Sequence, residues 1–271
     1  MKRTILTLAL AALLAVPGIG MAQDEQTAYI WINYMKAKPG QGDAMVALTI
    51  EEDSKVFNPL VDSGAALDWG LAMPMLHDGN DPYSHVEWIV FSGWAGADAF
   101  LGKFMEMQQS RSEEERAAMM EKYEAAVVDG SHSDDVYRIV HSAPGEAGPT
   151  YINLGFYTAK PGKESEAKEF YDDVAVPVYD KLKADGAINS YGLAVPAVHR
   201  DEAFTHMGWY SSADLATRDV VSTAFDAADA ARSEADNEAM GKRWAETFEP
   251  DGHMDQVLMV VHYYNGSGGG E

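Results

Sequence analysis

The chain has no cysteine among its 271 residues, and this absence excludes two features at once. No disulfide can form, and a signal of the lipoprotein type, which requires a cysteine, is ruled out. Basic residues are scarce, because 20 Lys and Arg stand against 43 Asp and Glu and the formal net charge is −23. Such a surface repels phosphate backbones and anionic lipid, so we expect neither nucleic acid nor a membrane as a partner.

Several enzyme motifs are missing as well. The sequence has no Gly-rich phosphate loop, no G-x-S-x-G elbow and no dinucleotide-binding fingerprint, so nothing supports a hydrolase or a kinase. Beyond the N-terminal region, no segment approaches the roughly 20 apolar residues that a membrane-spanning helix needs.

The N-terminus has the pattern of a secretory signal. Lys2 and Arg3 precede an apolar stretch over 5–17, and the small residues Gly20 and Ala22 flank Met21 before Gln23. The apolar stretch is too short to span a bilayer. We therefore predict a signal peptide over 1–22 and an acidic mature protein in the periplasm or outside the cell, with an uncleaved anchor as the alternative.

The sequence does contain a tandem repeat of one unit. All eight histidines form pairs separated by 121 or 122 residues, as do several turn and strand residues. The histidine pairs are His77/His199, His85/His206, His132/His253 and His141/His262. A tandem duplication of this length predicts two copies of one structural unit.

Each copy has the pattern β-α-β-β-α-β. The predicted strands are 29–35, 67–73, 85–91 and 136–141, and 151–157, 189–195, 206–210 and 257–262. Helices are expected before Gly64 and Gly186, over 97–108 and 218–231, and after the capping boxes at Ser112 and, more weakly, Ser233. Pro59 and Pro177 lie in the first helix of each copy, where each predicts a kink or break.

Lys38-Pro39-Gly40 and Lys160-Pro161-Gly162 follow the first strand of each copy. With the β-α-β-β-α-β order, this turn resembles the dimeric α/β-barrel superfamily, whose members pair two ferredoxin-like sheets face to face. The resemblance implies an α+β fold in which two ferredoxin-like repeats pack as a fused dimeric α/β barrel. The predicted parts are repeat 1 over 28–142, a linker over 143–149, repeat 2 over 150–263 and a flexible tail over 264–271.

The superfamily includes antibiotic-biosynthesis monooxygenases, haem-degrading monooxygenases, chlorite dismutase-like haem proteins and members without known catalysis. Asn33 and Trp94 match the haem-degrading members, whereas Gly155 and Leu215 replace them in the second copy. The catalytic helix histidine of those members has no counterpart within 100–120. This departure argues against haem degradation.

Strand alternation places candidate site residues on one face. Ile30, Ile32 and Tyr34 form the more apolar face of the first strand, which we expect to pack on helices. The opposite faces should then line a cavity between the two sheets. The predicted catalytic residues are Glu87 and His85 as proton-transfer groups and Asn33 as an oxyanion partner. The predicted ligand-binding residues are Trp31, Asn153, Gly155, Tyr157, His206, Gly208 and Tyr210.

Three functions remain open at this point. The first is an exported small-molecule-binding barrel that holds an apolar or aromatic ligand between the sheets. The second is a cofactor-independent monooxygenase or isomerase that uses Glu87, His85 and Asn33. The third is a haem or divalent-metal protein that uses the duplicated histidines, although no metal ligand set and no cofactor is predicted. We expect a small molecule as the partner. The protein is expected to be either a monomer, in which the two repeats form a pseudo-dimer, or a homodimer.

Overall fold

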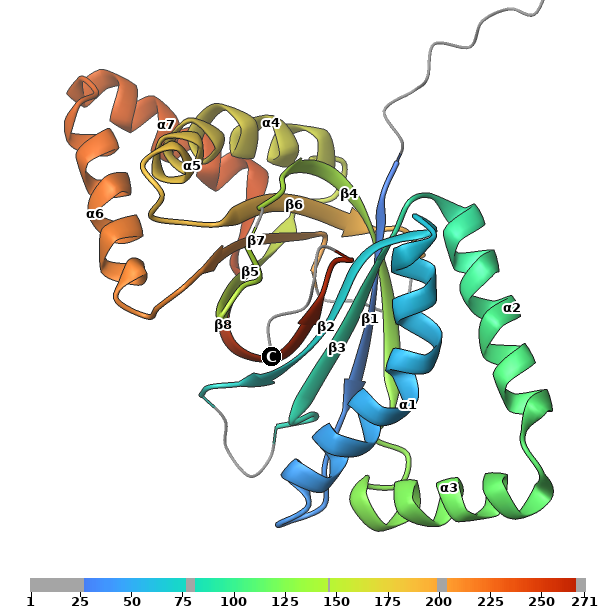
Figure 1. The fold of residues 1–271 in the computed structure, drawn as a ribbon. Coiled ribbons are helices and arrows are strands. Elements are labelled where there is room, and N and C mark those ends of the chain that lie inside the picture. Colours follow the sequence, from blue (N-terminus) through green and yellow to red (C-terminus); the bar gives the residue numbers. More distant parts are fainter. Residues whose placement is uncertain (1–26, 77–80, 146, 199–203, 267–271) are drawn as a thin grey trace, which may run out of the picture.

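Eight antiparallel strands in the described part of the chain close into one barrel (Figure 1). The structure, a computed structural model, describes residues 27–76, 81–145, 147–198 and 204–266. The first half contains β1 (Tyr29–Met35), α1 (Gly42–Asp62), β2 (Ala66–Pro74), β3 (His85–Phe91), α2 (Trp94–Ser110), α3 (Glu113–Ala126) and β4 (Ser133–Ala143). The second contains β5 (Tyr151–Ala159), α4 (Glu164–Val174), α5 (Val176–Ala184), β6 (Ser190–Pro196), β7 (His206–Ser212), α6 (Thr217–Ala230), α7 (Glu234–Thr247) and β8 (Phe248–Tyr264).

The strand order around the barrel is β1-β3-β2-β8-β5-β7-β6-β4. Within each half the last strand pairs with the first, the first with the third and the third with the second. Two seams, β2–β8 and β4–β6, join the halves. Because each seam pairs a strand of one half with a strand of the other, one chain supplies the whole closed barrel.

Aromatic side chains and two duplicated histidines pack at these seams. The His262 ring of β8 lies 4.4 Å from the Trp69 ring of β2, measured between centroids. At the other seam the His141 ring of β4 stacks on Tyr191 of β6, with centroids 5.6 Å apart and planes 23° apart. Trp69 and Tyr191 are among the most deeply buried side chains. This pair of histidines therefore has a packing role in the seams.

Two strand glycines are required by close approach of an indole ring. A Cβ on Gly70 would lie 2.4 Å from the ring of Trp88, and one on Gly192 would lie 2.3 Å from the ring of Trp209. Each glycine also faces a backbone carbonyl across a seam, of His262 and His141 respectively. The tryptophans can thus lie flat against the neighbouring strand inside the barrel.

The barrel interior is apolar, and its composition corrects the predicted strand faces. Ile30, Ile32 and Tyr34 pack there with residues of both halves, not on the helices. The buried members of this interior core are Ile30, Ile32, Ala72, Val86, Val90, Tyr137, Phe156, Ala194, Met207 and Leu258. Both faces of each strand are covered, so alternation separated the two faces but could not tell which one meets the helices.

The helices cover the outer faces of the strands. In Figure 1, α1, α2 and α3 lie on one side of the barrel and α4 to α7 on the other. Phe57 and Leu60 of α1 pack on Trp69 and Phe91 of the sheet. The face that carries Trp31, Glu87 and Ile89 therefore points toward helices, and the predicted site residues lie outside the barrel interior.

Helix ends follow the predicted signals closely. Ser112 accepts a hydrogen bond from the Glu115 amide and the Glu115 carboxylate accepts one from the Ser112 amide, so the capping box is complete. Ser233 makes only the first of these bonds. Near Pro177 the helix is interrupted between Val174 and Val176, whereas α1 continues through Pro59 and ends three residues later at Asp62. The predicted break is thus confirmed in the second half.

The last strand is longer than the 257–262 expected, because β8 begins at Phe248 and pairs with β5 from there. No helix in the described ranges is long and apolar enough to cross a membrane. The predicted signal over 1–22, most of the tail, and His77 and His199 lie outside the described residues.

Candidate active site

A pocket of about 590 Å³ lies between the first half of the sheet and helices α1, α2 and α3. Its strand side holds Trp31, Asn33 and Glu87, three of the predicted site residues. Its helix side is largely apolar and includes Phe100, Phe104, Met107, Met119 and Met120. We call this cavity the first-half pocket. A concave, mostly apolar space with a few polar groups is the usual form of a small-molecule site.

Two carboxyl groups meet in the wall of this pocket. Glu87 on β3 is 4% exposed, and Asp53 reaches it from α1. The two carboxyls interact, and each one shifts the pKa of the other. Asn33, directly opposite Glu87 on β1, donates from Nδ2 to Glu87 Oε2 at 3.3 Å. The pair is held from a strand on one side and a helix on the other.

Burial makes both carboxyls hold protons unusually tightly. Burial raises the pKa of Asp53 to about 6, and the hydrogen bond from Glu87 limits that rise. The pKa of Glu87 is raised well above its ordinary range, first by burial and then by the charge of Asp53. Because their interaction lowers the pKa of Asp53 and raises that of Glu87, Asp53 is the first of the pair to ionise as pH rises.

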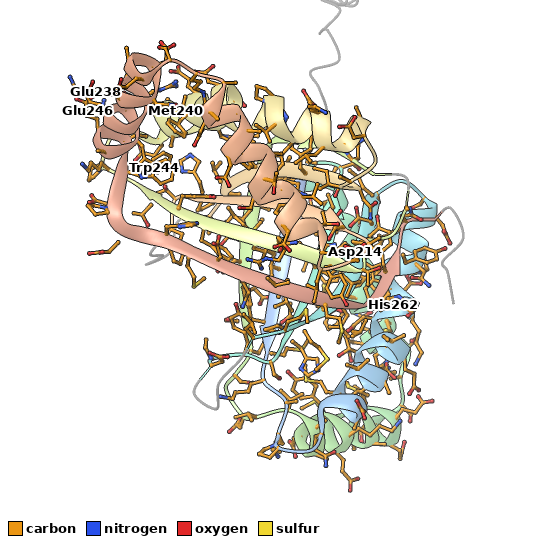
Figure 2. All side chains as sticks on the ribbon, turned by 90° about the vertical axis from the view of Figure 1, so that its left-hand side faces the viewer. Asp214, Glu238, Met240, Trp244, Glu246 and His262 are labelled. Atoms are coloured by element: carbon orange, nitrogen blue, oxygen red, sulfur yellow. The ribbon has the colours of Figure 1, made fainter. Side chains whose placement is uncertain are left out.

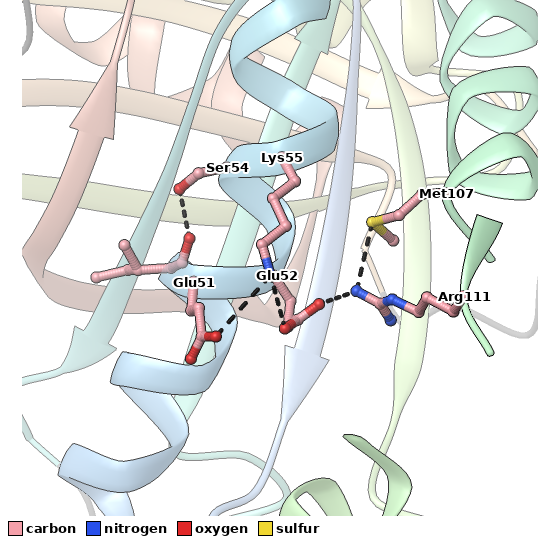
Figure 3. Close-up of polar contacts among 7 residues, drawn as sticks. Glu51, Glu52, Ser54, Lys55, Met107 and Arg111 are labelled. Atoms are coloured by element: carbon pink, nitrogen blue, oxygen red, sulfur yellow. Dashed lines mark hydrogen bonds and ion pairs between the residues drawn. The ribbon is translucent and has the colours of Figure 1, made fainter. Parts of the chain in front are cut away.

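An ion pair bridges the pocket between α1 and the end of α2. The Arg111 guanidinium contacts the Glu52 carboxylate and lies 3.6 Å from Met107 Sδ (Figure 3). Lys55 also bonds Glu52, at 3.0 Å. The Arg111 and Glu52 side chains are 12% and 16% exposed, so the pair is shielded from solvent more than a surface salt bridge. The Arg111–Glu52 contact fixes one wall of the pocket.

Further polar groups of the pocket come from β1 and from the start of β4. Trp31 Nε1 donates to Asp134 Oδ1 at 2.9 Å, and His132 Nε2 lies 3.4 Å from the same oxygen. Asn33 Oδ1 is buried and has no hydrogen-bond partner among the described residues. An unpaired amide oxygen beside the carboxyl pair is free to accept a hydrogen bond from a bound molecule.

His85 lies apart from this group, although it shares a strand face with Glu87. It is 1% exposed and does not line the first-half pocket. Its Nδ1 is 2.8 Å from Ser84 Oγ, and Ser84 Oγ accepts a hydrogen bond from the Ala37 amide. His206 repeats this arrangement with Thr205, at 2.8 Å. The duplicated pair therefore anchors the turn after the first strand of each half.

The other predicted ligand residues line a different cavity, of about 340 Å³, between the second half of the sheet and its helices. We call it the second-half pocket. Trp244 reaches it from α7 (Figure 2). The predicted members are Asn153, Gly155, Tyr157, His206, Gly208 and Tyr210. The single cavity predicted between the sheets is thus replaced by two pockets on opposite outer faces, because the site face of each sheet points toward its own helices.

A smaller cavity of about 250 Å³ does lie between the sheets, but with other walls. Trp88 and Trp209 line it together with aliphatic residues of both halves. Asp68 is its buried acid: burial raises its pKa to about 6, opposed by the hydrogen bond from Trp88 Nε1. We call it the interior cavity.

Metal ligation finds no support in the described residues. Within them, no group of three or more His, Asp or Glu side chains could hold a metal ion. His132 and His253 instead lie 3.4 and 3.1 Å from the aspartates two residues further on, Asp134 and Asp255.

Sequence reasoning found Glu87 and Asn33 but missed Asp53, Glu52 and Arg111. A signal for Asp53 was present, because Met45, Thr49, Asp53, Val56 and Phe57 share one helix face and only one of them is charged. A carboxyl on an otherwise apolar stripe marks a buried acid. Its partner Glu87 lies on another element far along the sequence, so the spacing of residues could not show that the two carboxyls meet.

We expect the Asp53–Glu87 pair to lower stability as pH rises. In the unfolded chain both carboxyls titrate near pH 4, whereas in the folded protein the pKa of Asp53 is raised to about 6 and that of Glu87 is raised well above its ordinary range. The stabilising contribution is therefore full below pH 4 and is lost as pH rises through the folded pKa values. Relative to wild type, Asp53→Asn/Glu87→Gln should gain roughly 1–3 kcal/mol between pH 4 and 8. Urea unfolding of both proteins across this range measures the difference, and parallel pH curves would contradict the coupling.

The comparisons with known proteins bear on the fold. No family model matches the chain, and no curated protein matches it. A candidate monooxygenase from Fusobacterium nucleatum superposes with a TM-score of 0.57 at 10% identity, over 91% of this chain and 97% of its own. A candidate monooxygenase from Lactobacillus acidophilus gives 0.55 at 10% identity, over 89% and 97%. An anthrone oxidase-like protein gives 0.52 at 10% identity, over 90% and 95%.

At this identity the likeness establishes a shared fold and nothing about activity. The predicted α+β fold is supported at that level. The class that fold and site define is an eight-stranded α+β barrel with a buried carboxyl pair in a largely apolar pocket.

Proposed function

We propose that this chain binds a small, largely apolar molecule in the first-half pocket and transfers a proton on it with Asp53 and Glu87. The observation that carries the proposal is the pair itself, in which buried Glu87 and half-buried Asp53 shift each other's pKa in the wall of a 590 Å³ cavity. Placing two carboxyls together away from water is costly, and groups with strongly shifted pKa values are concentrated at functional sites. A structural core position would be filled better by apolar side chains.

The two carboxyls have different roles in this proposal. Asp53, ionised at neutral pH, takes a proton from an acidic C–H or O–H of the substrate. Glu87, protonated, donates to the substrate oxygen on which negative charge develops. Asn33 holds Glu87 through Nδ2, and its unpaired Oδ1 accepts a hydrogen bond from a substrate hydroxyl. In this proposal Glu87 is therefore the acid and Asp53 the base.

The substrate class that suits this site is an enolisable aromatic ketone or a phenol. The proton goes to Asp53, the C–H electron pair moves onto the carbonyl oxygen, and Glu87 hydrogen-bonds the resulting enolate. Returning the proton at another carbon completes an isomerisation. Alternatively, reaction of the enolate with O₂ completes an oxygenation. Two structural neighbours are named a monooxygenase and an anthrone oxidase-like protein, and we therefore choose anthrone as the probe. For anthrone and one O₂ the products are anthraquinone and one water.

Anthrone in D₂O tests this function directly. We expect the protein to accelerate deuterium incorporation at the anthrone methylene, measured by mass spectrometry, with oxygen uptake followed in parallel. Leu48→Trp, which fills the first-half pocket from α1, should abolish the acceleration. Val220→Trp, at a 48% exposed position on α6, is the matched control and should leave it unchanged. Exchange no faster than in buffer, or insensitive to Leu48→Trp, would contradict the proposal.

The second candidate function is binding alone, of an apolar or aromatic ligand between the two sheets. The interior cavity favours it, since about 250 Å³ of space adjoins Trp88 and Trp209. Under this alternative Glu87→Gln would leave ligand affinity unchanged, because Glu87 does not line the interior cavity.

The proposal also includes the architecture and location that the sequence predicts. Units over 28–142 and 150–263, each of the ferredoxin-like type, would descend from one duplicated ancestor, and the recurrence of the element order supports this. A signal over 1–22 would export the protein to the periplasm or beyond. Fractionation of cells expressing the full chain tests the location.

A further inference from the structure

The second-half pocket keeps the frame of the first-half pocket but lacks the Asn33 and Glu87 side chains. Asn33 pairs with Glu87 across β1 and β3. In the same register of β5 and β7, Gly155 pairs with Gly208. Glu87, the proposed acid, and Asn33, which holds it, therefore have no side-chain counterpart in the second half. The second-half pocket cannot perform the same proton transfer.

Aromatic side chains surround the space that the glycines leave. A Cβ on Gly155 would lie 2.7 Å from Tyr157 Oη, so this tyrosine folds over the strand where the acid pair would lie. Tyr179 and Tyr210 face one another with ring centroids 5.8 Å apart and planes 36° apart. Phe170 and Trp244 meet edge to face at 5.4 Å. Tyrosine and tryptophan walls favour a flat aromatic ligand.

One polar side chain in this pocket has no partner at all. Asn153 on β5 is 6% exposed, and neither its Nδ2 nor its Oδ1 has a hydrogen bond within the described chain. A buried amide left unpaired is costly, and such groups are rare in folded proteins. Since Asn153 lines the pocket, a bound molecule that offers both an acceptor and a donor would satisfy it.

The charges around the second-half pocket balance. Arg218 and Asp255 both line it, one of each sign. The first-half pocket instead holds four acids, Glu52, Asp53, Glu87 and Asp134, against Arg111 and His132. A balanced lining gives no preference for an anion or a cation, so the ligand that fits is neutral.

We propose that the second-half pocket is a separate, non-catalytic recognition site for a neutral, flat aromatic molecule that carries a hydrogen-bond donor beside an acceptor. Asn153 binds the polar edge of this molecule through two hydrogen bonds, donating one from Nδ2 and accepting one at Oδ1, as in a carboxamide pair. The aromatic walls enclose the rings. This site is independent of the proton transfer proposed for the first half, and it would let one chain bind two different molecules.

Calorimetric titration with a matched pair of probes tests the site. 2-Naphthamide has the donor and acceptor edge, and 2-methylnaphthalene has the same rings without it. We expect wild type to bind the amide about tenfold to a hundredfold more tightly, the worth of two hydrogen bonds. Asn153→Leu should remove this preference while the hydrocarbon binds as before. Equal affinity of wild type for both probes, or an unchanged preference in Asn153→Leu, would overturn the proposal.

Two blocking variants decide where the amide binds. Gly208→Leu fills the second-half pocket, where a Cβ would meet Tyr171 and Tyr157 at ordinary distances of 3.6 and 3.7 Å. It should weaken binding at least tenfold, whereas Leu48→Trp in the first-half pocket should not. The reverse pattern would reject the assignment. Because the anthrone test depends on Leu48→Trp and not on Gly208→Leu, failure of one proposal is separable from failure of the other, and Gly208→Leu carries the test if Asn153→Leu does not fold.

Discussion

Glu87→Gln is expected to lower proton transfer about 10²- to 10⁴-fold, the range that positioned acid–base groups contribute. The glutamine keeps the size of the side chain and can still donate to Asp53, but it has no proton to release. Asp53→Asn should cause a loss of similar size, because it removes the base. The two effects should not add in the double variant, since both groups act in the same proton-transfer step. Deuterium incorporation into anthrone measures all three.

The pH profile separates a chemical role from a structural one. Since Asp53 raises the pKa of Glu87 through its charge and hydrogen bond, Asp53→Asn should lower that pKa. As pH rises, the residual activity of Asp53→Asn should therefore be lost at a lower pH than the activity of wild type, because Glu87 loses its proton earlier. Glu114→Gln, a fully exposed carboxyl outside the pocket, is the control and should change neither rate nor profile. Full activity in Glu87→Gln would leave the carboxyl pair without a catalytic role.

The periodicity of the sequence predicted the elements well but not the direction in which the strands face. Strand alternation placed Trp31, Asn33 and Glu87 together, and they do share one pocket. It also pointed them toward the barrel interior, where Ile30, Ile32 and Val86 are found. When helices cover one face and a second sheet covers the other, both faces are buried, and the more apolar face belongs to the interior, which has little access to water.

The sequence predicted that Gly155 and Gly208 line the same cavity as Asn33 and Glu87, between the two sheets. The structure puts each pair in its own pocket, with the barrel between them. Duplicated positions have the same strand register in their own halves but lie in different pockets. The spacing in the sequence could therefore not show that the two site faces point in different directions.

Trp69→Ala should destabilise the protein by about 3–5 kcal/mol, which is typical for truncation of a fully buried tryptophan. Trp69 is 0% exposed, its Nε1 donates to Asn58 Oδ1 at 2.8 Å, and its ring contacts Phe57 with centroids 5.2 Å apart. On its other side lies His262 of β8, from the second half. The substitution therefore opens a cavity, orphans the Asn58 amide oxygen and removes a contact across a seam.

Because the seams make one closed barrel, the damage at Trp69 should reach both halves. Urea unfolding followed by far-UV circular dichroism should show one cooperative transition in wild type and in Trp69→Ala, shifted to lower urea in the variant. Trp94→Ala is the matched control, since Trp94 is 46% exposed at the start of α2 and should cost about 1 kcal/mol or less. Two separate transitions, with only the first affected by Trp69→Ala, would mean that the halves are independent folding units and that the seams β2–β8 and β4–β6 contribute little to stability.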